Sequence, residues 1–281
     1  HPSLVYQQMS LAYERGIQKM WILNVGDIKP AEYQVELFLD MAWNLEAVKQ
    51  QGVAAHQRHF LEREFGKNRA DRLQPVMQEA YRLAYIRKPE FMGNTRTEEK
   101  DPKFKVISDL PWCEQEINER LAAYRQLSDK VEQEWHALPA QKKETYFQLV
   151  KYPVQAAAQM NNKLLTAQLA RHGKADWADS DRAYDSIVSL TKTYNTTKWN
   201  RMMDFQPRRL LVFNRVERKA LSSGLLEKPQ AVYTWNGADC VEGASVICEG
   251  LGYEGKAVAV EKKKELTFEF AAWETDSVEV E

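Results

Sequence analysis

The segment WILNVGDIKP, residues 21–30, decides the fold class of the N-terminal part of the chain. It belongs to an apolar run, KMWILNVG, that has the length of a strand and no polar alternation, as in strands covered on both faces. The run ends on Asn24, Gly26 and Asp27, and Pro30 then suits the first turn of a helix. Helical sequence lies on both sides, so the order helix, buried strand, polar turn, helix predicts a piece of parallel α/β architecture.

The two flanking helices are predicted from apolar periodicity. Residues 3–15 repeat apolar side chains near a 3.6 period, with Ser3 as the expected N-cap and Gly16 as the stop. Residues 31–51 predict a single helix, and its apolar stripe consists of Val35, Phe38, Leu39, Ala42 and Trp43. A single strand cannot form a sheet, so the other strands must come from elsewhere.

The rest of the chain divides into a helical part and a strand-rich part. Long helical patterns with short joins predict a bundle at 54–66, 68–88, 108–138, 139–172 and 179–195. Kinks are expected at Pro75 and Pro153, and the last helix is expected to be capped by Asp179 or Ser180. After about residue 207, short period-2 segments between glycines predict the start of an antiparallel β-sandwich.

The fold class is therefore mainly α, in three predicted domains. Residues 1–52 form part of a parallel α/β domain, residues 53–206 a helical bundle, and residues 207–281 a partial sandwich. The sandwich ends on a strand-like VEVE, which indicates that it is incomplete.

Composition excludes several classes of function. The 281 residues carry a formal net charge of −1, which argues against a dominant nucleic-acid or membrane-surface role. No apolar run reaches the roughly 18 residues of a membrane span. The chain opens on His-Pro-Ser without a basic-then-apolar leader, which indicates an internal cut or a mature N-terminus.

No motif predicts a cofactor or a metal ion. Cys113 is expected to be a small core residue, and Cys240 and Cys248 could bridge neighbouring strands or stay free. His56 and His59 could share a helix face, but no acidic or cysteine partner lies at metal-ligand spacing. The chain also lacks a Gly-x-Ser-x-Gly motif and a phosphate-binding glycine loop.

The polar end of the predicted strand is the candidate site. In parallel α/β structures, functional groups cluster beyond the C-terminal ends of the strands, where Asn24 and Asp27 are expected. Asp27 could accept a hydrogen bond from a ligand hydroxyl, or it could cap the following helix. Lys29 could bind an anion near the helix N-terminus, or it could be a solvated side chain.

Several long segments resemble xylan α-glucuronidases of glycoside hydrolase family 115. The N-terminal segment QMSLAYERGIQKMWILNVGDIKPAEYQVELFLDMAWN is similar to the late part of that family's barrel. The segments YIRKPEFMG, YFQLVKYPVQAAAQMNNKLLTAQLA and TTKWNRMMDFQPRR are similar to the helical domain that follows it, and the tail is similar to the start of its C-terminal β-sandwich. The resemblance implies that the chain is the C-terminal portion of a longer enzyme with a (β/α)8 barrel.

The resemblance also implies an activity and a site. Such enzymes remove glucuronic acid or 4-O-methylglucuronic acid from glucuronoxylan with inversion, which requires two carboxyl groups. These acid and base residues lie on earlier barrel strands, so the resemblance implies no catalytic residue in this chain, which alone is expected to be inactive. The family's NVGD motif corresponds to residues 24–27, which implies substrate binding by Asn24 first, Asp27 next and Lys29 last.

The resemblance implies a set of partners and a compartment. The partners are glucuronoxylan or acidic xylo-oligosaccharides, the missing N-terminal half of the enzyme and, in a homodimer, a second copy. Export to the periplasm or the cell exterior follows from the size of xylan. The alternative function is a non-catalytic helical module that binds a protein or a glycan. A doubly buried strand without partners in the same chain favours the enzyme portion.

Overall fold

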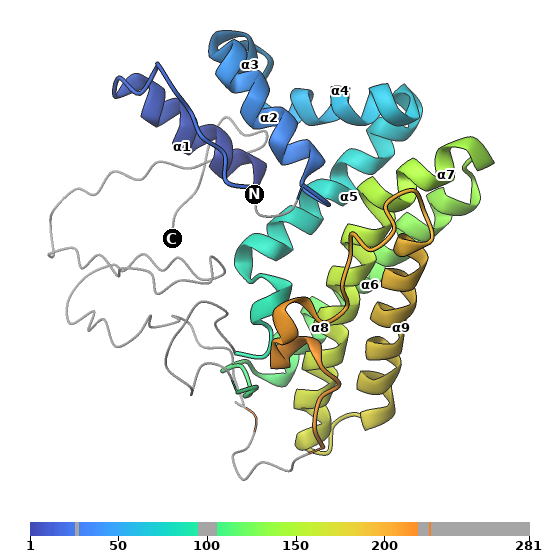
Figure 1. The fold of residues 1–281 in the computed structure, drawn as a ribbon. Helices are drawn as coiled ribbons and strands as arrows, with labels where there is room; N and C mark the ends of the chain where they lie inside the picture. The colour runs from blue at the N-terminus through green and yellow to red at the C-terminus, as the bar shows by residue number, and fades with distance from the viewer. Residues whose placement is uncertain (26–27, 95–105, 219–224, 226–281) are drawn as a thin grey trace, which may run out of the picture. The chain divides into compact units, whose positions relative to one another are not determined.

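The structure is a computed structural model, and it describes residues 1–25, 28–94, 106–218 and 225 (Figure 1). Compact packing divides these residues into two units, one ending at Tyr81 and the other beginning at Arg82. The described residues form helices and turns without a strand, so the predicted mainly helical class is confirmed. The predicted domain boundaries after residues 52 and 206 stay predictions.

The first unit is built from short helices around a small apolar core. Its helices are α1 (Pro2–Glu14), α2 (Glu32–Trp43), α3 (Leu45–Gln51), α4 (Val53–Phe65) and the start of α5 (Lys67–Ile86). Helix α1 packs against α2 and α4. The core consists of Leu37, Met41, Leu45, Val48 and Val53, and half-buried side chains of α1 cover it. The helices predicted at 3–15 and 54–66 are confirmed, and Gly66 ends α4 with a positive φ, as expected. The predicted N-cap Ser3 is wrong: His1 caps α1, and its Nδ1 accepts from the backbone N–H of Ser3 at 3.2 Å.

The single helix predicted over residues 31–51 is wrong, because the chain breaks at Asn44. Asn44 leaves helical geometry with φ −153°, and its Oδ1 accepts a hydrogen bond from the backbone N–H of Ala47 at 3.0 Å. This cap begins α3 as a new helix. The predicted apolar stripe is also wrong in part: Leu39 and Trp43 are exposed, whereas Leu37 and Met41 fill the core.

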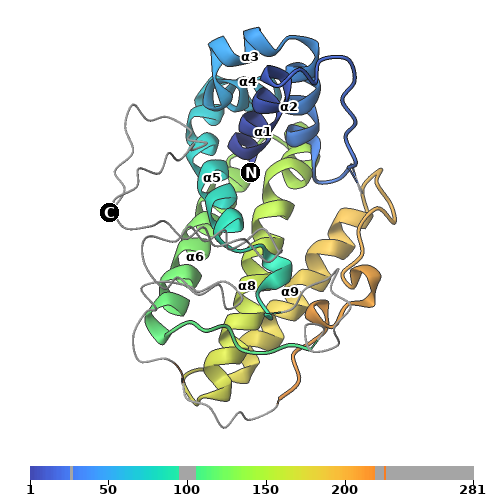
Figure 2. The ribbon, with the colours of Figure 1, turned by 90° about the vertical axis from the view of Figure 1, so that its left-hand side faces the viewer.

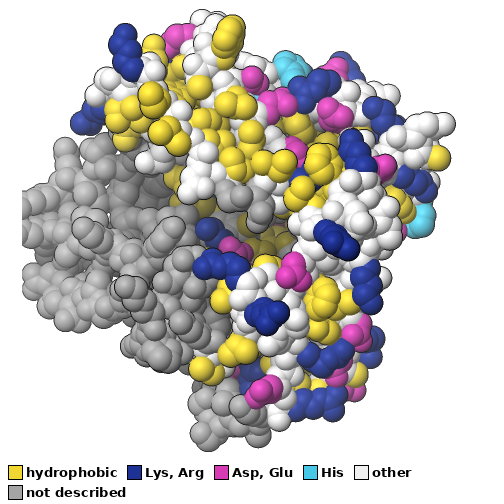
Figure 3. Space-filling model, in the orientation of Figure 1, with side chains coloured by type: hydrophobic (Ala, Val, Ile, Leu, Met, Phe, Trp, Pro, Cys, Tyr) yellow, Lys and Arg dark blue, Asp and Glu magenta, His cyan; other side chains and the backbone are white. Residues whose placement is uncertain are grey.

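The strand predicted in the KMWILNVG run is not formed in the described residues. Residues 17–25 pass from α1 to α2 without strand pairing, and Figure 2 shows them in an open connection between these helices. Met20 and Ile22 are exposed by 72% and 82% of their surface. The physical reason is that a strand satisfies its backbone only through a neighbour, and the described residues offer none. Hydrophobic side chains accordingly gather on the face over α1 and α2 in Figure 3.

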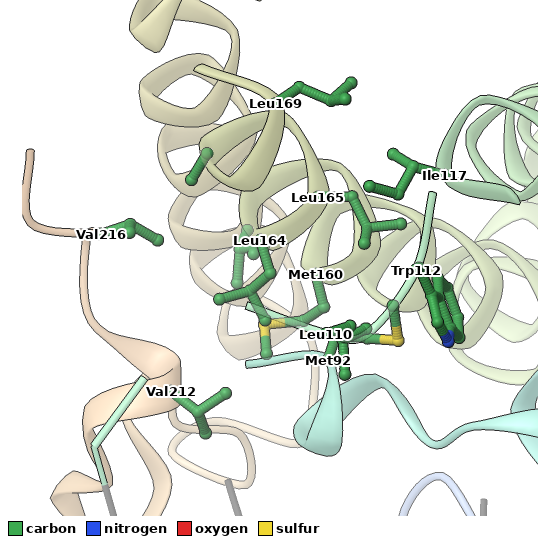
Figure 4. Packing of buried hydrophobic residues seen from close by; sticks show 12 residues of the cluster. Met92, Leu110, Trp112, Ile117, Met160, Leu164, Leu165, Leu169, Val212 and Val216 are labelled. Carbon is green, nitrogen blue, oxygen red and sulfur yellow. The ribbon is translucent and has the colours of Figure 1, made fainter. Parts of the chain in front are cut away.

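The second unit is a bundle around one central helix. It contains the end of α5, a short 3₁₀ turn η1 (Pro89–Phe91), α6 (Glu114–His136), α7 (Ala140–Tyr146), α8 (Tyr152–Arg171) and α9 (Trp177–Asn195). Helix α8 packs against both α6 and α9. Figure 4 shows Met160 and Leu164 of α8 beside Leu110 and Met92, with Val212 and Val216 to one side and Trp112 to the other.

Two details of the predicted bundle need correction. The last helix is capped by Asp176, whose carboxylate accepts from the N–H of Ala178 at 2.9 Å, and not by Asp179 or Ser180. The chain before Pro153 forms a π-helical turn, η3 (Phe147–Lys151), between α7 and α8. Proline lacks the N–H that an α-helix needs, and the wider π turn is a way to accommodate that loss.

The predicted sandwich lies mostly outside the described residues. Residues 207–218 contain two 3₁₀ turns, η4 (Pro207–Arg209) and η5 (Leu211–Phe213). Residues 219–224 and 226–281, with Cys240 and Cys248, lie outside the described part, so these predictions stay predictions. Cys113 is buried, as predicted. Among the described helices, none has the length and apolar composition needed to cross a membrane.

Lys163 of α8 is fully buried and holds the segment after α9 to the bundle. Its Nζ donates hydrogen bonds to the carbonyl oxygens of Val212 at 2.6 Å and Asn214 at 2.9 Å. Burial lowers the pKa of Lys163 from its ordinary value of 10.5 to about 7. A neutral amine has two hydrogens, so it satisfies both carbonyls without a buried charge.

We expect Lys163→Met to lower the free energy of unfolding by about 2 kcal/mol or more at pH 9.5, because two buried carbonyls lose their donor. The loss should shrink toward pH 6. Between pH 7 and 10.5 the unfolded lysine holds a proton that the folded lysine has released, so the stability of the unmodified chain rises with pH in this window. Urea unfolding at pH 6, 8 and 9.5 measures the difference.

The matched control is Lys142→Met, which removes an exposed lysine from α7. Its effect on unfolding should be small and independent of pH. An equal loss for Lys163→Met at pH 6 and pH 9.5 would contradict the account.

Candidate functional site

Trp21 anchors the segment that carries the candidate site. Its ring lies 5.7 Å from the ring of Phe38 on α2 and 6.4 Å from that of Tyr13 on α1, measured between centroids. Its indole Nε1 donates to the carbonyl oxygen of Ile17 at 2.7 Å. The indole thus packs on both helices while its polar N–H stays hydrogen-bonded, which fixes the path of the chain.

Asn24 lies just after this anchor, and the structure exposes it at the surface. The neighbouring Ile22 and Leu23 are exposed as well. A side-chain amide both donates and accepts hydrogen bonds, so it can bind a sugar hydroxyl or a carboxylate in either role. Of the two predicted site residues that the structure describes, Asn24 is therefore the exposed one.

Lys29 lies in a different environment from Asn24. It is buried, and its Nζ pairs with the carboxylate of Glu32 in the first turn of α2. The negative Glu32 is favoured at this helix N-terminus, and Lys29 balances its charge. The positive charge of Lys29 is thus paired with the carboxylate of Glu32. Its predicted role in substrate binding stays a prediction.

The start of α2 bears on the capping alternative for Asp27. Ala31 occupies the N-cap position, and its own methyl side chain cannot form a capping hydrogen bond. Gly26 and Asp27 lie outside the described residues. The predicted ligand role of Asp27 therefore stays a prediction. The two predicted residues that the structure describes, Asn24 and Lys29, share one connection but differ in exposure.

Tyr33, one turn into α2, has a structural role. Its hydroxyl donates to the carbonyl oxygen of Val53 at 3.3 Å, and the ring packs against Phe60. Burial raises the pKa of Tyr33 above its ordinary value, so the hydroxyl stays protonated and serves as a donor to the core. In the described part of the chain, no three His, Cys, Asp or Glu side chains are grouped so as to hold a metal ion.

Sequence reasoning missed a hollow between α2, α3 and α4, which Trp43, Asp40 and His56 help to line. The predicted helix over residues 31–51 assigned Trp43 to the core. Asn44 was the available signal, because Asn is a preferred N-cap residue and a helix start there changes which side chains face outward.

A family model and a solved structure agree on one family. The family model described as Glycosyl hydrolase family 115 matches residues 1–91. A solved 4-O-methyl-α-glucuronidase of family 115, described as specific for decorated arabinogalactans, is 63% identical to the chain, with a TM-score of 0.80. The match covers 92% of this chain and 34% of that protein, so the chain spans about a third of its length. No curated protein matches the chain.

We expect Trp21→Ala to destabilise the first unit by about 1.5–3 kcal/mol, the scale of one large apolar side chain removed from packing. Asn24→Ala should change stability by less than about 0.5 kcal/mol, because exposed positions away from core contacts tolerate substitution. Thermal unfolding followed by circular dichroism measures both changes.

Ile22→Ala is the control, since Ile22 lies beside Trp21 but is 82% exposed. It should behave like Asn24→Ala. If Trp21→Ala proved as mild as Ile22→Ala, Trp21 would not be the anchor.

Proposed function

The chain belongs to glycoside hydrolase family 115, and we propose that it is part of an enzyme that removes glucuronic acid or 4-O-methylglucuronic acid from a plant polysaccharide. The observation that carries the proposal is the 63% identity over 92% of the chain with a 4-O-methyl-α-glucuronidase. At this identity, two chains share a fold and most of their local chemistry. Because the chain spans 34% of that protein, the activity belongs to the longer enzyme.

We propose that residues 19–26 are a late strand of a (β/α)8 barrel whose other strands lie in the rest of that enzyme. The exposure of Met20, Ile22 and Leu23 supports this proposal. Each such side chain gains about 1.5–3 kcal/mol when it is buried, so an unpaired apolar run is costly to leave in water. The alternative, a self-sufficient binding module, would leave this run without a partner.

In the proposed barrel, Asn24 and Asp27 lie at the C-terminal end of the strand, on the face where barrel enzymes bind substrate. Inverting hydrolysis needs one carboxylic acid to protonate the leaving oxygen and one carboxylate to activate water. We assign both groups to earlier strands. The task of this chain is to bind the sugar: the amide of Asn24 orients a hydroxyl or the uronate, and Asp27 accepts from a hydroxyl.

The choice of polysaccharide has two candidates. Family resemblance favours glucuronoxylan, where the uronic acid is α-1,2-linked. The similar solved enzyme is described as specific for decorated arabinogalactans, which favours that substrate. Each candidate rests on its own support, so both polysaccharides belong in the test. Polysaccharides of this size are degraded outside the cytoplasm, so we propose that the enzyme is exported to the periplasm or the cell exterior. We also propose that it assembles as a homodimer.

The first test compares the 281-residue chain with the full-length enzyme. The full-length enzyme should release 4-O-methylglucuronic acid from glucuronoxylan, decorated arabinogalactan or both, measured by anion-exchange chromatography. The isolated chain should release none, because it lacks the acid and base. Release by the isolated chain would overturn the proposal, and so would a full-length enzyme inactive on both polysaccharides.

The second test is Asn24→Ala in the full-length enzyme. We expect kcat/KM to fall at least about tenfold, which corresponds to roughly 1.4 kcal/mol of lost transition-state binding. Lys19→Ala is the control, because Lys19 is exposed at the opposite end of the same segment. Unchanged kinetics in Asn24→Ala, with the fold intact, would remove Asn24 from the site.

A further inference from the structure

A hollow of about 340 Å³ opens between α2, α3 and α4 in the first unit. Its size lies at the lower end of the range of small-ligand pockets, about 300–1,000 Å³. Helix α2 contributes Asp40 and Trp43, α3 begins at its edge with Asn44, and α4 contributes His56 and Arg63. All these elements belong to one compact unit, so the hollow is fixed by local packing.

Trp43 gives the hollow a flat apolar wall. Its side chain is 92% exposed, although indole is among the largest apolar side chains. Trp43 is the last residue of α2, and the chain leaves helical geometry at the next residue, Asn44. The C–H groups on one face of a sugar ring pack well on such a ring, whose apolar body is joined to a polar N–H.

The polar groups of the hollow point to a hydroxyl-rich ligand. Asp40 Oδ2 lies 3.0 Å from His56 Nε2, and the other ring nitrogen of His56, Nδ1, is buried without a hydrogen-bond partner in the described residues. His56 itself is only 6% exposed. The exposed Asp40 is therefore the member of this pair that a ligand can reach. Gln51, also on the wall, holds His59 Nδ1 through its Nε2 at 2.6 Å and presents an amide oxygen as acceptor.

The charge of the hollow favours a neutral ligand over an acidic one. Arg63 donates two hydrogen bonds to Glu36, at 2.9 and 2.7 Å, so its charge is balanced within the wall. Asp40 adds a second carboxylate, and its side chain is 53% exposed. An anionic sugar such as a uronate would meet this negative charge and be repelled. A neutral sugar meets only donors, acceptors and the indole.

We propose that this hollow binds neutral sugar residues of a polysaccharide, with Trp43 as the stacking platform and Asp40, Asn44 and Gln51 as hydroxyl partners. The inference goes beyond removal of the acidic branch, and it rests on the proposed function only for the class of polymer. An ammonium ligand fits less well. Aromatic cages for such cations use several Trp, Tyr or Phe rings, and the other ring of this kind in the hollow, Phe60, is buried.

The test is direct binding by the full-length protein to two neutral probes, β-1,4-xylohexaose and a β-1,3-linked galacto-oligosaccharide, measured by isothermal titration calorimetry. Neither probe carries uronic acid, so binding is measured without hydrolysis. We expect at least one probe to bind, and Trp43→Ala to weaken that binding about tenfold, the scale of one stacking contact in a partly desolvated site. Trp43→Phe keeps a ring and should retain most of the affinity.

The matched control is Leu39→Ala, because Leu39 is also an exposed apolar residue of α2 but does not line the hollow. It should bind as the unmodified protein does, and all variants should melt at the same temperature. Binding of neither probe, equal binding by Trp43→Ala and Leu39→Ala variants, or binding of choline in place of both sugars would overturn the inference. If the full-length protein bound a neutral probe through Trp43 but released no uronic acid from either polysaccharide, only the proposed function would be contradicted.

Discussion

Helix α8 organises the second unit because its polar side chains are buried and must find partners. Buried donors and acceptors without hydrogen bonds cost about 1–3 kcal/mol each, so their partners become fixed points of the fold. Gln168 exchanges two hydrogen bonds with the backbone of Leu110, at 3.0 and 2.9 Å. Lys163 holds the turn at residues 212–214, and Asn161 accepts from Arg120 of α6 at 2.7 Å. Apolar packing makes the bundle compact, whereas these polar contacts decide which loop docks where.

The sequence predicted the positions of the helices, which depend on local apolar periodicity. It did not predict helix breaks and caps where several neighbouring residues suit the same role. Apolar periodicity located the helices, and Gly66 and Gly173 mark helix ends because both adopt a positive φ that other residues avoid. The break at Asn44 was missed since the apolar pattern continues through it. The cap of α9 was misplaced for a similar reason: Asp176 and Asp179 are both preferred cap residues, and only the three-dimensional path of the loop selects between them.

The apolar run before Asn24 illustrates a second limit. Its composition predicts a strand buried on both faces, and composition does report how much burial the segment needs. Composition does not show which other segments would pack against this run. In the described residues Trp21 packs between α1 and α2, while Ile22 remains in water. For the candidate site, the sequence identified Asn24 as an accessible polar group but gave Lys29 no sign of its pairing with Glu32. That pair depends on the shape of the turn before α2.

The two binding regions that we propose in the first unit differ in charge. A branched acidic polysaccharide presents a neutral backbone and negatively charged branches, and one surface cannot favour both equally. The amide of Asn24 carries no charge and can donate to a carboxylate. The hollow beside Trp43 holds two carboxylates against one guanidinium, so a uronate would lose its hydration there without gaining a cation. A neutral backbone sugar pays no such penalty and gains contact with the indole. Electrostatics therefore supports the two proposals together, branch binding near residue 24 and backbone binding near residue 43.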